Sequence, residues 1–381
     1  MRVTIASRIY APEPAAAAYR LEALADALAG RGHEVTVLTT AVPGRVAPAP
    51  SHPRIRVARA PVFRDARGQV RGYLQYLSFD VPLFFRLAFG RRAEVIVTEP
   101  PPTTGFVVRV AAAIRRTPYV YYAADVWSDA AESTGAPAFV VGAVRRLERV
   151  ALAGAARVIA VTDGVAERVR RLAGHDRVEV VRNGVDTGIF TPDGPRVAGP
   201  PTAVYAGTTS EWQGAEVFVR AMPRVRERVA DARLVFIGQG SAWDDLRELT
   251  ASVAPDAVDF VDLLPPEQAA VRLRSARVGL VSLKPGLGYD FAVPTKLFAA
   301  AACGTPVLFA GEGASVAVVR EGAIGTAVDY DDEQVADALV AALSAQPSSS
   351  DRARISGWVG AHASIAATGD RAAEVVEGSA R

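Results

Sequence analysis

The chain has 381 residues, of which 50% are hydrophobic and 22% are charged, with a formal net charge of +2. This length exceeds what one ordinary hydrophobic core holds, so we expect about two domains. The composition excludes a wholly disordered, collagenous or coiled-coil chain, and the near balance of 43 basic and 41 acidic residues excludes a polycation built for nucleic acid.

Signals for metal binding and for membrane insertion are missing from the sequence. The single cysteine, Cys303, lies in an apolar run and is interpreted as a packing residue, and the four histidines lack metal-ligand spacing. The apolar run after Arg2 ends at Arg8, which is too short for the hydrophobic segment of a signal peptide. No uncharged apolar run reaches about 18 residues, the length needed to span a membrane. We therefore expect a cytoplasmic protein with no metal site.

The first half alternates short runs rich in valine and isoleucine with helical stretches. Residues 3–7 predict a strand, and residues 15–29 predict a helix that ends at Gly30. Further strands are predicted at 34–39, 55–60, 93–98, 118–123, 157–161 and 178–181. This rhythm predicts parallel β-α-β units with helices on both faces of a sheet.

A break rich in proline and glycine at residues 191–201 predicts a linker, after which the rhythm restarts. Strands are predicted at 203–206, 234–237, 258–261, 278–283, 306–310 and 325–329, and helices at 215–230, 243–253, 267–275 and 295–302. A tail helix is predicted from about 351 to 377, with N-cap residues in 348–351. The fold class is thus α/β, with two Rossmann-like doubly wound domains facing a cleft where a ligand would bind.

Three loops after strands of the second half are candidate phosphate sites. The loop at 205–214 offers hydroxyls before a helix, with an ordinary turn capped by Ser210 as the alternative. Gly238 and Gly240 would let a ligand approach the backbone. The third loop enters a helix with Lys296 in its first turn, where a cation opposes the helix dipole unless an anion shares the site. We predict that Lys296 binds phosphate, with a solvated surface lysine as the alternative.

The first half offers polar candidates after two of its strands. Glu13, Tyr19 and Arg20 lie in the loop and helix that follow the first strand. Asp125 follows the strand at 118–123. It is interpreted as a hydrogen-bond partner of a sugar hydroxyl or as a catalytic base, with a helix N-cap as the alternative. Asn183, before a glycine, mainly indicates a turn.

Two further patterns have a more ordinary interpretation. Residues 329–332 contain an Asp-x-Asp pattern, for which helix capping is favoured over metal binding. Residues 72–92 are aromatic and followed by arginines, for which a core helix is favoured over contact with a membrane or a greasy acceptor.

Taken in order, these stretches resemble the retaining glycosyltransferases of the GT-B fold, family 4, especially the bacterial branch that builds surface polysaccharides. The resemblance covers nearly the whole chain. No single motif is decisive, and the order and spacing of the motifs together indicate the fold. The matching stretches are residues 32–39, 99–102, 125–127, 181–186, 205–207, 237–240, 293–298 and 304–307.

The resemblance implies a function for each domain. Residues 201–354 would bind a nucleotide-sugar, with a UDP-sugar favoured. Residues 1–192 would bind a hydroxyl acceptor, either a lipid-linked glycan or a small-molecule natural product. The helix at about 355–381 would pack back on the first domain. No metal, cofactor or nucleic acid is expected, and peripheral contact with the inner membrane face stays an alternative.

The resemblance also assigns residues to roles. Asp125 and Lys296 would be catalytic. The donor would be bound by Gly207, Thr208, Thr209, Gln213, Gly238, Gly240, Asp290, Phe291, Val293, Pro294, Thr295, Lys296 and Leu297. The acceptor side would comprise Glu13, Ala15, Ala16, Tyr19, Arg20, Trp127 and Asn183.

The chain departs from the family pattern at several of these positions. Phe291 and Ala299 stand where many relatives carry glutamates, and Ala124 stands where a His or Arg often precedes the aspartate. Asp290 is a candidate substitute for one glutamate. These departures keep two rival functions open, a catalytically inactive sugar-nucleotide-binding partner and, less favoured, a nucleotide-sugar epimerase, which would need acid/base side chains.

Overall fold

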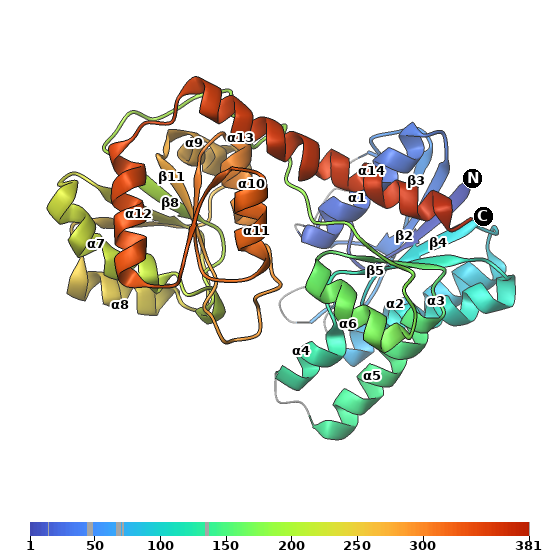
Figure 1. The fold of residues 1–381 in the computed structure, drawn as a ribbon. Helices are drawn as coiled ribbons and strands as arrows, with labels where there is room; N and C mark the ends of the chain where they lie inside the picture. Colours follow the sequence, from blue (N-terminus) through green and yellow to red (C-terminus); the bar gives the residue numbers. More distant parts are fainter. Residues whose placement is uncertain (14, 44–48, 66–69, 71, 134–136, 381) are drawn as a thin grey trace. The chain divides into compact units, whose positions relative to one another are not determined.

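The computed structural model describes residues 1–13, 15–43, 49–65, 70, 72–133 and 137–380. The chain divides into two compact units, which we describe separately. Unit 1 comprises Met1–Asn183 and Ile365–Arg381, and unit 2 comprises Gly184–Ser364. Each unit is a parallel sheet covered by helices on both faces, as Figure 1 shows. The predicted fold class, two Rossmann-like doubly wound domains, is confirmed.

Unit 1 is built on a seven-stranded parallel sheet in the order β3-β2-β1-β4-β5-β6-β7. Because β1 pairs with both β2 and β4, the strand order reverses beside β1, and loops there diverge enough to form a site. Both faces are covered, so β4 and β5 consist entirely of buried residues. The strands are β1 (Arg2–Ala6), β2 (Glu34–Thr40), β3 (Ile55–Ala60), β4 (Val95–Thr98), β5 (Tyr119–Ala123), β6 (Arg157–Ala160) and β7 (Val178–Val180).

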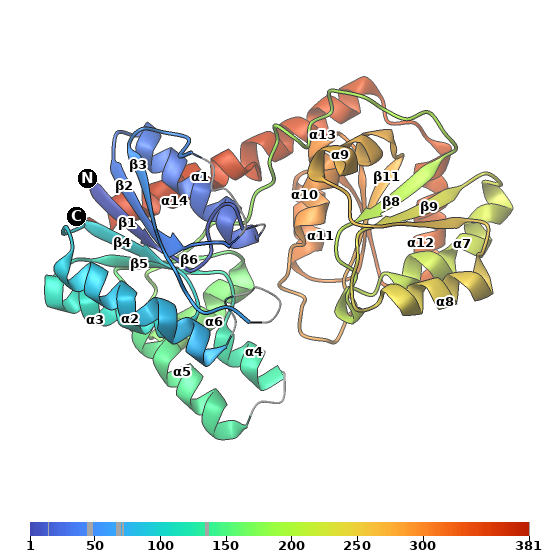
Figure 2. The ribbon, with the colours of Figure 1, turned by 180° about the vertical axis from the view of Figure 1, so that it is seen from behind.

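The helices of unit 1 pack in two groups. On one side α1 packs against α14, and on the other α2 packs against α3, which packs against α5 (Figures 1 and 2). The helices are α1 (Ala16–Gly30), α2 (Tyr73–Phe89), α3 (Pro102–Arg115), α4 (Trp127–Ser133), α5 (Ala138–Ala153), α6 (Asp163–Ala173) and α14 (Ile365–Gly378).

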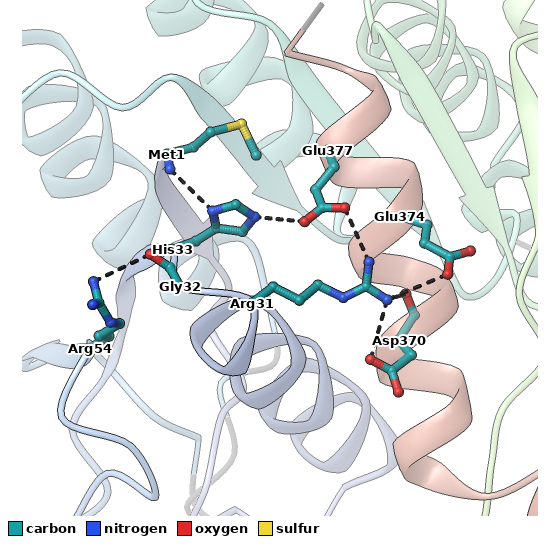
Figure 3. A network of polar contacts seen from close by, with 8 residues as sticks. All are labelled: Met1, Arg31, Gly32, His33, Arg54, Asp370, Glu374 and Glu377. Carbon is teal, nitrogen blue, oxygen red and sulfur yellow. Dashed lines mark hydrogen bonds and ion pairs between the residues drawn. The ribbon is translucent and has the colours of Figure 1, made fainter.

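A polar network fastens α14 to the turn between α1 and β2 (Figure 3). Arg31 forms ion pairs of 3.3, 3.4 and 3.1 Å with Asp370, Glu374 and Glu377, which share one face of α14. His33 Nε2 lies 2.7 Å from Glu377 Oε1, and this hydrogen bond lowers the pKa of Glu377. Exposed pairs contribute little singly, so the network mainly positions a helix that is held by its packing.

That packing is closest at Gly369. A Cβ added there would collide with the carbonyl oxygen of Ala23 on α1. Gly369→Ala is therefore expected to lower the free energy of unfolding by about 1–3 kcal/mol, measured by urea unfolding. Gly378, on the same helix, has no described atom within 4 Å of an added Cβ, so Gly378→Ala is the matched control and should cost nothing. Equal effects of the two substitutions would contradict the close approach of the helices.

Unit 2 is built on a six-stranded parallel sheet in the order β10-β9-β8-β11-β12-β13. Here β8 pairs with both β9 and β11, so the strand order reverses beside β8. The loops that follow β8, β9 and β11 are therefore the expected binding region of this unit. The strands are β8 (Thr202–Ala206), β9 (Arg233–Ile237), β10 (Val258–Val261), β11 (Val278–Ser282), β12 (Val307–Ala310) and β13 (Gly325–Val328).

The helices of unit 2 also form two groups around its sheet. One group packs α7 against α8 and α12, and the other packs α10 against α9 and α13 (Figure 1). The helices are the 3-10 helix η1 (Glu211–Gln213), α7 (Glu216–Arg228), α8 (Trp243–Val253), α9 (Pro266–Ser275), α10 (Thr295–Ala302), α11 (Ala314–Glu321), α12 (Asp332–Ser344) and α13 (Ser349–His362). Cys303 is buried in this core, which confirms its interpretation as a packing residue.

Each predicted strand is present within two residues of its expected bounds, but the unit boundaries differ from the prediction. The first unit ends at Asn183 rather than at 192, because Val185 is buried in the core of unit 2 and its amide donates to Ala363 O. The proline-rich stretch at 191–201 is no linker between the units. Arg274 holds it against α9 by donating to Thr191 O and Pro195 O.

The tail forms two helices, α13 and α14, and the prediction of a single helix over 351–377 is wrong. The break falls at Ala363 and Ser364, where the backbone pairs with Val185 instead of continuing the helix. Residues 355–364 consequently lie in unit 2, and only residues from Ile365 onward lie in unit 1. The predicted N-cap is confirmed, since the Ser348 side chain accepts from the Asp351 amide.

The structure also shows the roles of residues 329–332 and of the aromatic stretch at 72–92. Asp331 accepts from the amides of Glu333 and Gln334, so its predicted role as a helix cap is confirmed. The aromatic stretch forms α2, whose buried face includes Phe79, Leu83 and Leu87, but whose other face is exposed. The prediction of a core helix is therefore only half right. No helix in the described part of the chain is long and apolar enough to cross a membrane.

Candidate functional site

Lys296 is the centre of the candidate site in unit 2. It lies in the first turn of α10, and its Nζ donates to Tyr205 Oη at 2.6 Å and to Thr208 O at 2.8 Å. The ammonium also lies 3.8 Å from the centre of the Tyr205 ring, within the range of a cation–π interaction. The structure thus joins the first and third predicted loops through one lysine.

Lys296 is half-buried, and among the described residues no carboxylate forms an ion pair with it. Burial lowers the pKa of Lys296 well below its ordinary value. Its neighbour Gly207 has a φ of 130°, and a Cβ at that position would lie 3.4 Å from Lys296 Cε. A cation near a helix N-terminus that has no carboxylate partner among the described residues offers the charge that an anion would require. The interpretation of Lys296 as a solvated surface lysine is wrong.

Gly238 and Gly240 are required by the packing of two loops. A Cβ at Gly238 would collide with Gly207 O, and a Cβ at Gly240 would collide with Thr209 O. The two loops also share backbone hydrogen bonds, from Gly207 N to Ile237 O at 2.8 Å and from Thr209 N to Gln239 O at 3.0 Å. The glycines therefore shape the floor of the site by allowing the backbones to approach.

Some residues assigned to the donor are used inside the protein instead. Gln213 is buried, and its Oε1 accepts from the Ser210 amide at 3.1 Å, as in a capping box. Thr209 is fully buried. Leu297 is fully buried in the core of unit 2, and its amide donates to Pro294 O, so its assignment to the donor is wrong. The Gln213 side chain thus braces the loop, whereas the buried Thr209 hydroxyl has no hydrogen-bond partner among the described residues.

The third loop runs from β11 to α10 and carries an aromatic cluster. The rings of Trp212 and Tyr289 stack at 4.5 Å, and Phe291 lies 6.5 Å from Tyr289. Asp290 and Thr295 are exposed, whereas Phe291, Val293 and Pro294 are half-buried. The start of α11 holds the backbone of this loop, because the Asp290 carbonyl accepts from Ala314 N and the Ala292 carbonyl accepts from Ser315 Oγ. Accessible polar and aromatic groups thus lie on the loop that leads into α10.

Unit 1 has a buried charged group beside its strand-order reversal. Arg20, on α1, forms an ion pair with Glu99 at 3.1 Å, and the two side chains are 5% and 4% exposed. Glu99 follows β4 and also accepts from Ser7 Oγ at 2.7 Å. Arg20 donates in addition to Asn183 Oδ1 at 3.1 Å and lies over the Tyr122 ring at 4.9 Å. The predicted residues Arg20 and Asn183 are therefore in contact.

Asp125 lies after β5 and is exposed, as a substrate-facing carboxylate must be. Partial loss of hydration raises the pKa of Asp125, and the positive charge of Arg20 opposes this shift. Asp125 does not cap α4. The amides of Trp127 and Ser128 donate instead to the buried carboxylate of Glu148, at 2.7 and 3.0 Å. The N-cap interpretation of Asp125 is therefore wrong, and its side chain is exposed to solvent.

The other residues assigned to the acceptor side are spread over the loop before α1 and the start of α4. Tyr19 is 49% exposed and Ala16 is exposed, whereas Ala15 contributes its carbonyl, which accepts from Tyr19 N. Glu13 forms an ion pair with Arg64 at 2.7 Å, which uses its charge within the protein. The Trp127 ring packs edge-on against Tyr76 at 6.0 Å.

Glu99 and Tyr205 lie in stretches that match the family pattern, but the sequence analysis gave them no role, and Glu148 lies outside every stretch that it singled out. Glu99 had a readable signal, because a charged residue directly after a fully apolar strand lies at the edge where ligands bind. The side-chain roles of Tyr205 and Glu148 had no local signal, since each side chain contacts a partner that is distant along the chain, Lys296 and the start of α4 respectively.

Family models match most of the chain. Residues 16–184 match a model described as a glycosyl transferase 4-like domain, and residues 200–345 match one described as glycosyl transferases group 1. These two matches, on a chain of two doubly wound domains, identify a glycosyltransferase of the GT-B class. The chain belongs to the family-4-like members of that class, which confirms the resemblance.

The relatives are distant and match in part. A D-inositol 3-phosphate glycosyltransferase of Pseudarthrobacter chlorophenolicus is 32% identical over 190 residues, which are 46% of this chain and 44% of that protein. A GDP-mannose-dependent alpha-(1-6)-phosphatidylinositol monomannoside mannosyltransferase of Mycolicibacterium smegmatis is 28% identical over 191 residues, which are 47% of this chain and 49% of that protein. The chain thus aligns with about half the length of these relatives.

A solved structure matches the whole fold. The Anabaena protein HepE, in complex with UDP and glucose, superimposes with a TM-score of 0.70, at 16% identity and with 99% of each chain covered. At this level of identity the likeness concerns the fold.

Proposed function

We propose that the protein is an active retaining glycosyltransferase that moves a sugar from a UDP-sugar to a hydroxyl group of an acceptor. The observation that carries the proposal is Lys296, a half-buried lysine with a lowered pKa at the start of α10, held beside the glycine loops of β8 and β9. A diphosphate placed there would receive a positive charge and the favourable end of a helix dipole.

In the proposed reaction the bond from the anomeric carbon to the β-phosphate oxygen breaks, and the acceptor oxygen bonds to that carbon on the same face. The acceptor proton passes to the released diphosphate. Negative charge grows on the diphosphate as the bond breaks, so Lys296 would stabilise the transition state more than the ground state. Lys296 would supply the charge that a divalent cation supplies elsewhere, and we expect turnover to be unchanged by a chelator.

Unit 1 would bind and orient the acceptor. Asp125 is exposed and is not used as a cap, so its carboxylate is available to a sugar or acceptor hydroxyl. The buried pair of Arg20 and Glu99 would act as positioning residues, since they fix Asn183 and the loop after β1. Holding two substrates in a reactive geometry is itself a large part of the rate enhancement in such a transfer.

The choice of UDP rests on HepE, which was crystallised with UDP, whereas the name of the mycobacterial relative specifies GDP-mannose. The named acceptors of the relatives are an inositol phosphate and a phosphatidylinositol monomannoside, so each carries ring hydroxyls. We propose an acceptor of that kind, a lipid-linked glycan or a small polyhydroxylated molecule.

A catalytically inactive nucleotide-sugar-binding protein is the second candidate. Phe291, Ala299 and Ala124 remove the polar groups that the family pattern leads one to expect. A protein of this kind would keep the anion site at Lys296 and lose turnover.

A panel of UDP-, GDP- and TDP-sugars tests the proposal by thermal shift and by release of free nucleotide. Stabilisation by UDP-sugars together with slow hydrolysis is expected for the transferase. Stabilisation by GDP-sugars would overturn the choice of base. Stabilisation with no hydrolysis, and with no transfer to inositol-type acceptors, would favour the binding protein. A lack of response to every nucleotide would overturn both candidates.

A further inference from the structure

Unit 1 has a pocket on the edge of its sheet opposite to the loops that carry Glu99 and Asp125. The pocket has a volume of about 360 Å³ and lies between the C-terminal ends of α3 and α5. Its lining residues 117–118, 154–156 and 177 precede β5, β6 and β7, whereas Glu99 and Asp125 follow β4 and β5. Because β5 spans five residues at about 3.3 Å each, these two edges are roughly 15 Å apart. The pocket is therefore separate from the residues that we propose to bind and orient the acceptor.

Three arginines from three segments line this pocket. We call them the arginine triad: Arg109 on α3, Arg116 directly after α3, and Arg177 directly before β7. A Cβ added to Gly154 would collide with Arg109 Nε, so the glycine leaves the room in which the Arg109 guanidinium lies. Arg116 has a φ of 50°, a left-handed conformation in which glycine is the usual residue after a helix. The chain thus has an arginine at a position where the backbone favours glycine.

The positive charges of the triad have no acidic partner in the pocket. Its lining contains no Asp or Glu, and among the described residues no carboxylate forms an ion pair with any of the three arginines. Two carboxylates lie close by along the chain, Asp176 and Glu179. Glu179 pairs with Arg157 at 3.7 Å, and Asp176 is exposed and outside the lining. Like charges that are held together repel one another, so an anion bound between them would relieve this repulsion.

The helix ends beside the pocket do not neutralise the triad. The C-terminal ends of α3 and α5 each present about half a negative charge, so together they offset about one of the three positive charges. Carbonyl groups at both ends also accept backbone amides already. Ala112 O of α3 accepts from Thr117 N at 2.9 Å, and Leu152 O of α5 accepts from Ala155 N at 3.1 Å. Arg177 donates to Ala155 O at 3.3 Å. About two positive charges therefore remain for a ligand.

The rest of the lining is apolar or already hydrogen-bonded. Alanines make up much of it. The Tyr119 hydroxyl donates to Ala151 O, and the Thr117 hydroxyl donates to Ala93 O at 3.4 Å. Apart from the triad, the lining thus offers no side chain that would recognise a base or the hydroxyls of a sugar. A volume of about 360 Å³ is at the lower end for small-molecule pockets, so the ligand must be compact.

We propose that the arginine triad binds a compact soluble diphosphate. Guanidinium groups donate paired hydrogen bonds to phosphate oxygens, and their planar fork suits phosphate geometry. A diphosphate carries several negative charges at pH 7, which match the positive charges that remain in the pocket. A bound diphosphate would link the end of α3 to the start of β7, so it should also stabilise unit 1. The proposal stands on unit 1 alone and does not depend on sugar transfer.

Isothermal titration of the full chain with inorganic pyrophosphate tests the proposal. The titration uses the Lys296→Ala variant, so that the anion site proposed in unit 2 does not contribute to the binding. One equivalent of pyrophosphate is expected to bind, with an affinity that falls as the salt concentration rises. Adding Arg116→Gln and Arg177→Gln should weaken binding by at least about ten-fold, because charge-assisted hydrogen bonds are lost. Both side chains are exposed, so their replacement should leave the fold intact.

The matched control is Arg56→Gln combined with Arg371→Gln, two exposed arginines of unit 1 outside the pocket. It removes the same charge from the same unit and should leave the affinity unchanged. Circular dichroism of each variant checks its fold, and pyrophosphate should slow hydrogen exchange in residues 154–158 and 177–178.

Three results would overturn the proposal. The first is a lack of pyrophosphate binding to the Lys296→Ala variant. The second is an equal loss of affinity in the pocket and control variants, or protection from exchange confined to other segments. The third is a long polyphosphate chain that binds roughly a hundred-fold more tightly than pyrophosphate, because the ligand would then be a polymer that extends beyond the pocket.

Discussion

Lys296→Ala is expected to lower the rate of sugar transfer by roughly a hundred-fold. The substitution removes the ammonium held by Tyr205 and Thr208 at the start of α10. It thereby removes the positive charge that we assign to the leaving diphosphate. Nucleotide release from the preferred UDP-sugar measures the rate, and isothermal titration measures donor binding.

The matched control is Lys284→Ala. Lys284 is the chain's other lysine, is exposed, and pairs with Glu216 at 3.1 Å. Its replacement removes the same charge from the same unit and should change turnover little. If both alanine variants lose activity to the same extent, a general effect of charge explains the result and the assignment of Lys296 fails.

Lys296 also predicts a pH dependence of donor binding. Burial lowers the pKa of its ammonium in the free protein, and a diphosphate beside Nζ would raise that pKa by favouring the charged form. Between these two pKa values, binding takes up a proton. Donor affinity should therefore be greatest at low pH and fall as the pH rises through the lower of the two values. Titrations of UDP-glucose in buffers of different ionisation enthalpy measure the uptake, which Lys296→Ala should abolish.

Arg20→Ala is the second substitution expected to have a large effect, a loss of about 3–5 kcal/mol in the free energy of unfolding of unit 1. The reason is that Glu99, 4% exposed, would be left as an uncompensated charge in the interior. Hydrogen exchange of β1 and β4 during urea titration measures the stability of this unit separately from that of unit 2.

The control is the double variant Arg20→Met with Glu99→Gln. It removes both charges together and keeps an acceptor for Ser7 Oγ, so most of the lost stability should return. A double variant as unstable as Arg20→Ala would show that the packing of Arg20 on the Tyr122 ring, rather than its charge, holds this region.

The strands and most helices could be predicted from local pattern, because buried parallel strands are short apolar runs bounded by turn residues. The unit boundary could not. Residues 191–201 have the composition of a linker, but Arg274 holds them on α9, and Val185, inside an Asn-Gly turn region, is a core residue. These contacts join residues that are far apart in sequence, so they cannot be predicted from the composition of a segment.

The part of the candidate site that could be predicted is the part formed by loops that follow neighbouring strands. Loops after strands meet at one edge of a sheet, so Lys296, Gly207 and the glycines after β9 could be grouped in advance. The side-chain partners could not be predicted. A leucine in the first turn of a helix gives no sign that it belongs to the core, as Leu297 does. A buried carboxylate such as Glu148, which caps a helix from a different element, looks like any exposed glutamate in sequence.

Unit 1 is discontinuous along the chain, which has a consequence for synthesis on the ribosome. Unit 2 is a single segment, Gly184–Ser364, and is translated in full before α14. The face of α1 against which Gly369 packs must therefore wait uncovered while about 180 residues are translated. During that interval, the first domain to begin synthesis is the last to be completed, and it is the natural client for a chaperone.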